Sequence, residues 1–120
     1  MIDFNRHDTD CGILVVRVAG KLEGDSNQYF FDCIQDDIVS GRNHIVINFS
    51  DVGYISSAGL GSLVRARSRV SKSGGLIYLS RIENNLLDIF SVVNFDKVFS
   101  IFPTETEAIE AMKQHLPKER

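Results

Sequence analysis

Apolar residues in this chain fall alternately into short continuous runs and into sets with helical spacing. Residues 13–20, 45–49 and 76–79 are rich in Val, Ile and Leu, which favours strands. Residues 45–49 are apolar except for Asn48, a pattern typical of a parallel strand buried on both faces. Residues 2–4 form a shorter stretch that predicts a hairpin with 13–20. A last short strand is predicted over 98–102.

Helical spacing of apolar residues predicts four helices between these runs. The first covers 25–39, with Asp25 or Ser26 as its N-cap and Gly41 after its end. The second follows Ser56 and Ser57 and stops at the glycine pair 74–75. A short helix is predicted over 84–91. The last begins at Thr104, where Glu107 would complete a capping box, and runs to about Leu116.

The resulting order is a hairpin followed by alternating helices and strands. Alternation of this kind requires crossover connections, which are right-handed and produce a mainly parallel sheet. We therefore predict one α/β domain over residues 1–116, with a mixed, mostly parallel sheet, an N-terminal hairpin and about four helices. Residues 117–120 are expected to be a frayed tail.

Composition narrows the functional classes. The net charge of −3 argues against general nucleic-acid binding, which depends on Lys and Arg neutralising phosphates. No apolar run approaches the roughly 20 residues that span a bilayer, and the N-terminus lacks a signal-peptide layout. The cytoplasm is the expected location. Three scattered histidines and two cysteines form no metal-ligand cluster, and Cys11 and Cys33 are expected to be buried or half-buried thiols.

The segment most informative about function is 51–61, where the central strand leads into a helix through Ser56 and Ser57. A helix start exposes free backbone N–H groups and favours negative charge. One interpretation is that a serine only caps the helix. The other is that a serine carries a phosphate that acts as a switch. The two are compatible, because one hydroxyl can cap while its neighbour faces solvent.

Enzymatic interpretations of this segment are weaker. A hydrolase nucleophile elbow has the pattern G-x-S-x-G, whereas Tyr54 or Ile55 stands where the first glycine should be. Neither His44 nor His115 is well placed as a base. Gly59 and Gly61 match only part of a dinucleotide-binding motif, and no P-loop lysine is present. We predict that the protein is not an enzyme and needs no cofactor or metal.

Charge is distributed unevenly along the chain. No acidic residue occurs between Asp51 and Glu83, whereas the same stretch has five basic residues. An acidic group precedes it. Both groups could simply be solvated surfaces, or the basic one could steer an acidic protein partner toward the serine turn. The basic residues are Arg65, Arg67, Arg69, Lys72 and Arg81, and the acidic ones are Glu23, Asp25, Asp32, Asp36 and Asp37.

The order of elements, the phrase over residues 45–61 and the segment 20–23 together resemble a STAS domain. More narrowly, the chain is similar to the small anti-sigma-factor antagonists of bacteria. Such proteins bind an anti-sigma factor that is also a serine kinase, and so release the sigma factor. The kinase phosphorylates a serine in an Asp-Ser-Ser/Thr-Gly motif, which ends the binding, and a PP2C-type phosphatase restores it.

Aligned with that motif, Ser57 is the implied phosphorylation site, with Ser56 as second choice. Ser56 stands in place of the motif's carboxylate, and Ala58 replaces its last hydroxyl residue. Gly59 matches the glycine, and Glu23 matches an acidic residue that assists kinase contact. The predicted contact surface is the loop from Glu23 to Ser26, the serine turn and the start of the next helix. Its residues are Glu23, Asp25, Ser26, Ser56, Ser57, Ala58, Gly59 and Leu60.

The same sequence features also fit a second function. Some STAS domains act without a kinase, in transport assemblies or stress-signalling scaffolds, and fold similarity does not separate the two groups. In such a constitutive interaction subunit, Ser57 would only help to start the helix.

Overall fold

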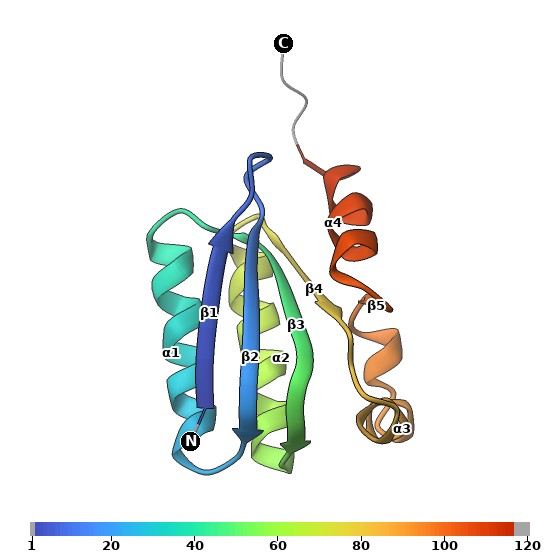
Figure 1. Ribbon diagram of the computed structural model, residues 1–120. Coiled ribbons are helices and arrows are strands. Elements are labelled where there is room, and N and C mark those ends of the chain that lie inside the picture. The colour runs from blue at the N-terminus through green and yellow to red at the C-terminus, as the bar shows by residue number, and fades with distance from the viewer. Residues whose placement is uncertain (1, 117–120) are drawn as a thin grey trace.

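The computed structural model of the chain describes residues 2–116, which form one five-stranded sheet with helices on both faces (Figure 1). The strands lie side by side in chain order, and the first connection is a hairpin. The elements are β1 (Ile2–Asp8), β2 (Leu14–Leu22), α1 (Asp25–Val39), β3 (His44–Ile55), α2 (Ser57–Lys72), β4 (Leu76–Ser80), α3 (Asn84–Val92), a 3₁₀ turn (Phe95–Lys97), β5 (Ile101–Phe102) and α4 (Glu105–Lys113).

Strand directions match the sequence prediction. β1 pairs with β2 antiparallel, and β2, β3, β4 and β5 pair in parallel. Because parallel neighbours need crossover connections, α1, α2 and α3 each separate two parallel strands. The predicted α/β class, the mixed sheet with its N-terminal hairpin and the four helices are confirmed.

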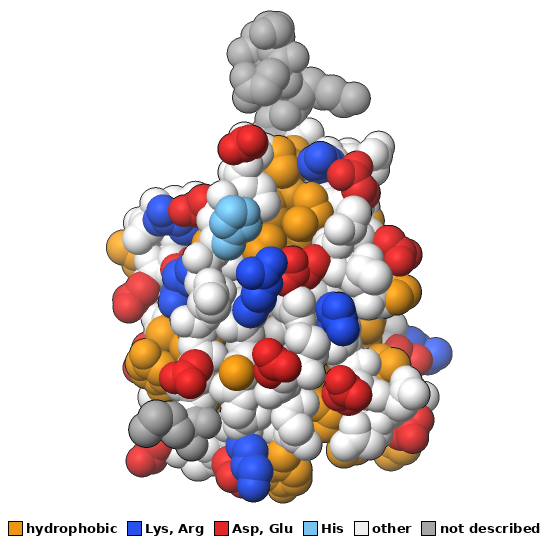
Figure 2. Space-filling model, in the orientation of Figure 1, with side chains coloured by type: hydrophobic (Ala, Val, Ile, Leu, Met, Phe, Trp, Pro, Cys, Tyr) orange, Lys and Arg blue, Asp and Glu red, His pale blue; other side chains and the backbone are white. Residues whose placement is uncertain are grey.

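The two faces of the sheet have different cores. α1, α2 and α3 cover one face with a large apolar cluster that includes Phe30, Leu63 and Phe90. α4 packs on the other face through Ala108 and Met112, against Val15 and Val46. α4 covers only part of its face (Figure 1), and the polar residues Asp3, Asn5, Arg17 and Asp51 help to line a depression over β1, β2 and β3. Figure 2 shows that acidic and basic side chains are interspersed there, without a large area of one sign.

Several predicted boundaries were wrong. β3 continues past residue 49 to Ile55, because β2 extends alongside it and pairs as far as Leu22 and Ile55, with two register shifts on the way. The last strand has only residues Ile101–Phe102. The N-cap of α1 is Gly24, whose φ of 56° suits glycine, instead of Asp25 or Ser26. Cys11 is exposed instead of buried. The predicted tail, 117–120, lies outside the described residues.

A polar group attaches α4 to the sheet. Thr104 caps α4 by accepting the Glu107 N–H, as predicted. Glu105 Oε2 accepts hydrogen bonds from Arg17 Nε at 2.7 Å and from Asn48 Nδ2 at 2.6 Å. The hydrogen bonds from Arg17 are the main reason that the pKa of the Glu105 carboxyl is lowered below its ordinary 4.5. The charged form of Glu105 is therefore favoured in the folded protein.

This lowered pKa predicts how stability depends on pH. A group whose pKa is lower in the folded state stabilises the fold above its unfolded pKa, and the stabilisation is lost as the pH falls through the folded pKa. We expect the free energy of unfolding of Glu105→Gln to fall less than that of the wild type between neutral pH and acidic conditions below pH 4.5. Urea titrations at several pH values measure this. Identical acid losses in both proteins would contradict the assignment, and Glu110→Gln, an exposed change on α4, is the control.

Candidate functional site

The serine turn joins the end of β3 to the start of α2. In Figure 1 it lies at the end of the molecule where β2 and β3 finish and α1 and α2 begin. This is the expected place for a site in a parallel α/β sheet, because the carboxyl ends of strands and the N-termini of helices meet there. The topology thus brings the β2–α1 loop and the serine turn to one end of the fold.

Ser56 is the N-cap of α2. Its backbone is extended, with φ −79° and ψ 169°, and Oγ accepts the Gly59 N–H at 3.0 Å. The same hydroxyl donates to the Leu22 carbonyl at 3.2 Å, and the Ser56 N–H donates to that carbonyl at 3.0 Å. Ser56 therefore links the start of α2 to the end of β2. The capping interpretation of this serine is correct.

Gly59 lies where α2 comes closest to β2. A Cβ at this position would stand 2.5 Å from the Leu22 carbonyl oxygen and 3.0 Å from Ile55 Cγ2. Only glycine permits this approach. The residue is buried, so it supports the turn from beneath and is not available for the contact surface on which the sequence had placed it.

Ser57 is exposed at the first position of α2. Ala58 beside it is also exposed, and Leu60 is half-buried. In the β2–α1 loop, Glu23 and Asp25 are exposed and Ser26 is half-buried. The Leu22 carbonyl, one residue before Glu23, is the atom that holds Ser56. The loop and the turn are thus joined directly, and the exposed members of the predicted set lie at the same end of the molecule.

One neighbour of the turn was missed from the sequence. Asn27 lies on the buried side of α1, and its Nδ2 is 3.5 Å from Ser56 Oγ. Its Oδ1 would lie 3.1 Å from a Cβ on Gly59. The available signal was a polar residue on the apolar side of the predicted helix, with Phe30 and Ile34 at helical spacing.

The basic residues of α2 lie at the surface, whereas one acidic residue of α1 is buried. Arg65 and Arg69 of α2 both lie over the ring of Phe31, and Arg67 lies over Phe99. All three arginines are exposed. Among the acidic residues of α1, Asp37 is the exception to a solvated role. It is 7% exposed and accepts two hydrogen bonds from Arg6 Nε and one from Nη2.

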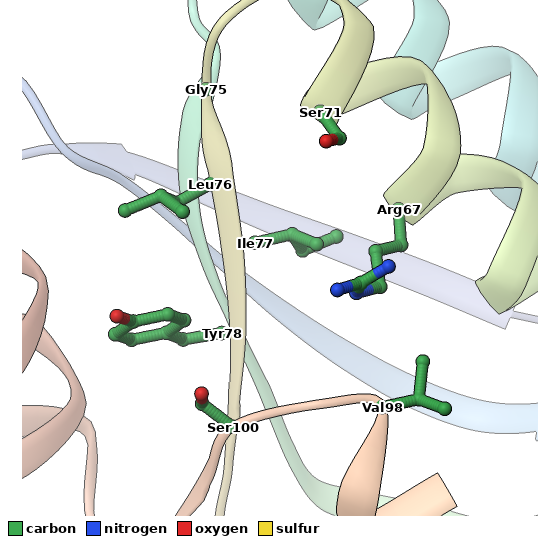
Figure 3. Close-up of a pocket in the computed structure, with 8 residues that line it drawn as sticks. All are labelled: Arg67, Ser71, Gly75, Leu76, Ile77, Tyr78, Val98 and Ser100. Atoms are coloured by element: carbon green, nitrogen blue, oxygen red, sulfur yellow. The ribbon is translucent and has the colours of Figure 1, made fainter.

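Figure 3 shows a small cleft of about 180 Å³ between α2, β4 and the segment before β5. Arg67, Ser71, Val98 and Ser100 line it, together with residues of β4. A shallow depression between the start of β1 and the start of α1 is lined by Asp3, Asp25, Ser26 and Tyr29, among others. Residues 2–116 contain no group of His, Cys, Asp and Glu side chains that could hold a metal ion.

Residues 5–108 match the model of the STAS domain family. The chain therefore belongs to this family, as its sequence predicts. The anti-sigma-factor antagonists of this family are non-enzymatic regulators. Within the described part of the chain, no helix has the length and apolar character needed to cross a bilayer.

Several similar proteins within the family are named as anti-sigma factor antagonists. A Thermotoga maritima protein named "putative anti-sigma factor antagonist" is 32% identical over 103 residues, which cover 85% of this chain and 91% of the relative. A crystal structure of a T. maritima protein with that description has a TM-score of 0.85 and 26% identity, over 92% of this chain and 94% of the other. The Bacillus protein SpoIIAA, an anti-sigma factor antagonist with solved unphosphorylated and phosphorylated forms, shares the fold. Its unphosphorylated form has a TM-score of 0.69 and 20% identity, over 91% of this chain and 96% of the other.

Proposed function

We propose that this protein is a cytoplasmic anti-sigma-factor antagonist that binds an anti-sigma serine kinase and is inactivated by phosphorylation of Ser57. A PP2C-type phosphatase would restore the binding form. The observation that carries the proposal is the division of roles between two adjacent serines. Ser56 is engaged as the helix cap, whereas Ser57 is exposed at the N-terminus of α2.

The physical chemistry of position 57 supports a phosphate there. The first backbone N–H groups of a helix lack intrahelical partners, and the helix dipole favours negative charge beside them. A phosphoserine at this point would leave the fold intact. Its effect would fall on a protein partner, because roughly two negative charges cannot be desolvated cheaply in an interface.

The proposed contact surface is the exposed part of the two connected segments. From the β2–α1 loop it takes Glu23, Asp25 and the edge of Ser26, and from the turn it takes Ser57, Ala58 and Leu60. Ser56 and Gly59 contribute as the support beneath them. The partner is expected to cover the N-termini of both α1 and α2.

The test uses the anti-sigma kinases encoded in the same genome, with ATP, followed by phosphopeptide mapping. We expect the wild type to bind one of them and to take up a single phosphate on Ser57. Ser57→Ala should bind the same kinase, take up no phosphate and keep its free energy of unfolding within about 1 kcal/mol, because the cap is Ser56.

Phosphate on Ser57→Ala would show that the acceptor is another residue. Binding of no anti-sigma factor, with retention in a membrane or scaffold assembly when purified from native cells, would instead support a constitutive STAS interaction subunit. The relatives named as antagonists favour the first function.

A further inference from the structure

Asn27 is a buried polar side chain that uses only part of its hydrogen-bonding capacity. The residue is 7% exposed. Within residues 2–116, its Oδ1 is the one buried side-chain nitrogen or oxygen without a hydrogen-bond partner. An unsatisfied buried acceptor costs about 1–3 kcal/mol. An apolar residue would fill this place more favourably, so packing alone does not account for the asparagine.

The Nδ2 atom of Asn27 contacts Ser56 Oγ, and this contact indicates the role of the residue. A serine hydroxyl has one donor and two acceptor sites. The Ser56 hydroxyl donates to the Leu22 carbonyl and accepts from the Gly59 N–H and from Asn27 Nδ2. At 3.5 Å the contact with Asn27 is the longest of the three, and it is the one that uses the second acceptor site. All three capacities of this hydroxyl are therefore occupied.

We propose that Asn27 is a specificity-determining residue of the switch, which keeps Ser56 as a saturated cap and so restricts phosphorylation to Ser57. The inference rests on the proposed function, because it concerns which of two neighbouring hydroxyls a kinase modifies. In the transfer, a serine Oγ forms a bond to the γ-phosphorus of ATP, the bond from that phosphorus to the β–γ bridging oxygen breaks, and ADP leaves. The hydroxyl proton passes to a base of the kinase.

Ser56 can undergo this reaction only by giving up its hydrogen bonds. Its proton is directed at the Leu22 carbonyl, and its lone pairs face Gly59 and Asn27. Ser57 is exposed and does not hold the helix start. The buried amide thus adds to the difference between the two adjacent serines, because it contacts Ser56 and not Ser57.

The test compares phosphate uptake in the Ser57→Ala protein with uptake in the double variant Asn27→Ala/Ser57→Ala. Removing Nδ2 frees one lone pair of Ser56 and loosens the cap. We expect the double variant to take up phosphate on Ser56, at a rate at least tenfold above the background measured with Ser57→Ala. Asn85→Ala, at an exposed asparagine of α3, replaces Asn27→Ala in the matched control and should leave Ser57→Ala unmodified.

A second measurement needs no kinase. In Asn27→Ala the amide hydrogen of Gly59 should exchange with solvent at least tenfold faster than in the wild type, while that of Ala108 in α4 stays unchanged. The urea concentration at the midpoint of unfolding should stay close to that of the wild type, because an unsatisfied acceptor is removed together with the donor. Asn27→Leu, which fills the same space, serves if the alanine variant does not fold.

The outcomes separate this inference from the proposed function. A wild type modified on Ser57, with a double variant as resistant as Ser57→Ala, overturns the role of Asn27 and leaves the proposed function standing. A wild type that no kinase modifies removes the proposed function. In that case unchanged Gly59 exchange overturns the positioning of Ser56 by Asn27 as well, whereas faster exchange supports that positioning in a protein without the switch.

Discussion

The Ser57→Glu variant is expected to bind the anti-sigma factor about a hundredfold more weakly than the wild type, a difference of about 2.7 kcal/mol in binding free energy. Ser57 is exposed at the proposed centre of the contact surface, so a partner that covers it must desolvate the new carboxylate. The fold should not weaken. Negative charge near the start of α2 is favourable by about 0.3–1 kcal/mol.

Calorimetric titration measures the affinity, and urea unfolding measures the stability of the same samples. Ser68→Glu is the matched control, because Ser68 is exposed on the same helix but lies about three turns from Ser57. Its affinity is expected to stay within about threefold of the wild type, which is less than 1 kcal/mol. Equal losses in both variants would mean that net charge, and not the position of the charge, governs binding.

Gly59→Ala is expected to lower the free energy of unfolding by about 1–3 kcal/mol, the usual cost of overpacking. The new methyl group would stand 2.5 Å from the Leu22 carbonyl oxygen, a backbone atom that is itself held by two hydrogen bonds from Ser56. α2 must therefore move away from β2. Because the serine turn moves with it, binding to the anti-sigma factor should also weaken.

Gly61→Ala provides the comparison two residues further along α2. A Cβ there has no heavy atom within 4 Å, and alanine is favoured over glycine in a helix by about 1 kcal/mol. This variant should be as stable as the wild type or more stable. Thermal and urea unfolding of the pair measure the difference. A Gly59→Ala protein as stable as Gly61→Ala would show that the approach to Leu22 is not tight.

The features that the sequence predicted are those determined by nearby residues. Apolar periodicity located all four helices, and the continuous run over 45–49 located the central strand. The extension of β3 to Ile55 was not predictable in this way. Its second half, residues 50–55, has two polar residues and a glycine among its apolar ones and is a strand because β2 lies beside it. Partners from distant segments override local preference in such strands.

The residues of the candidate site also fall into two groups, those that are neighbours in the chain and those that come from distant segments. Ser56, Ser57 and Gly59 are neighbours in the chain, and turn chemistry with helix capping identified them. Asn27 and the Leu22 carbonyl are 29 and 34 residues from Ser56. A backbone carbonyl has no signature in the sequence, and an asparagine on a buried helix face becomes informative only when its neighbours are known. The sequence therefore identified the members of the turn that are neighbours in the chain and not the two groups from distant segments that contact Ser56.

The edges of the sheet bear on a different property, the resistance of the protein to aggregation. β1 is an outer strand, and an unpaired strand edge is a template onto which another chain can add. Along β1 the exposed side chains include Asp3, Arg6 and Asp8, and such charges oppose strand addition. At the opposite edge β5 covers only Leu79 and Ser80 of β4, and Arg67 lies in the cleft beside the remainder (Figure 3). Charge at both edges therefore disfavours the addition of another chain to the sheet, and the proposed contact surface lies away from these edges, at the N-termini of α1 and α2.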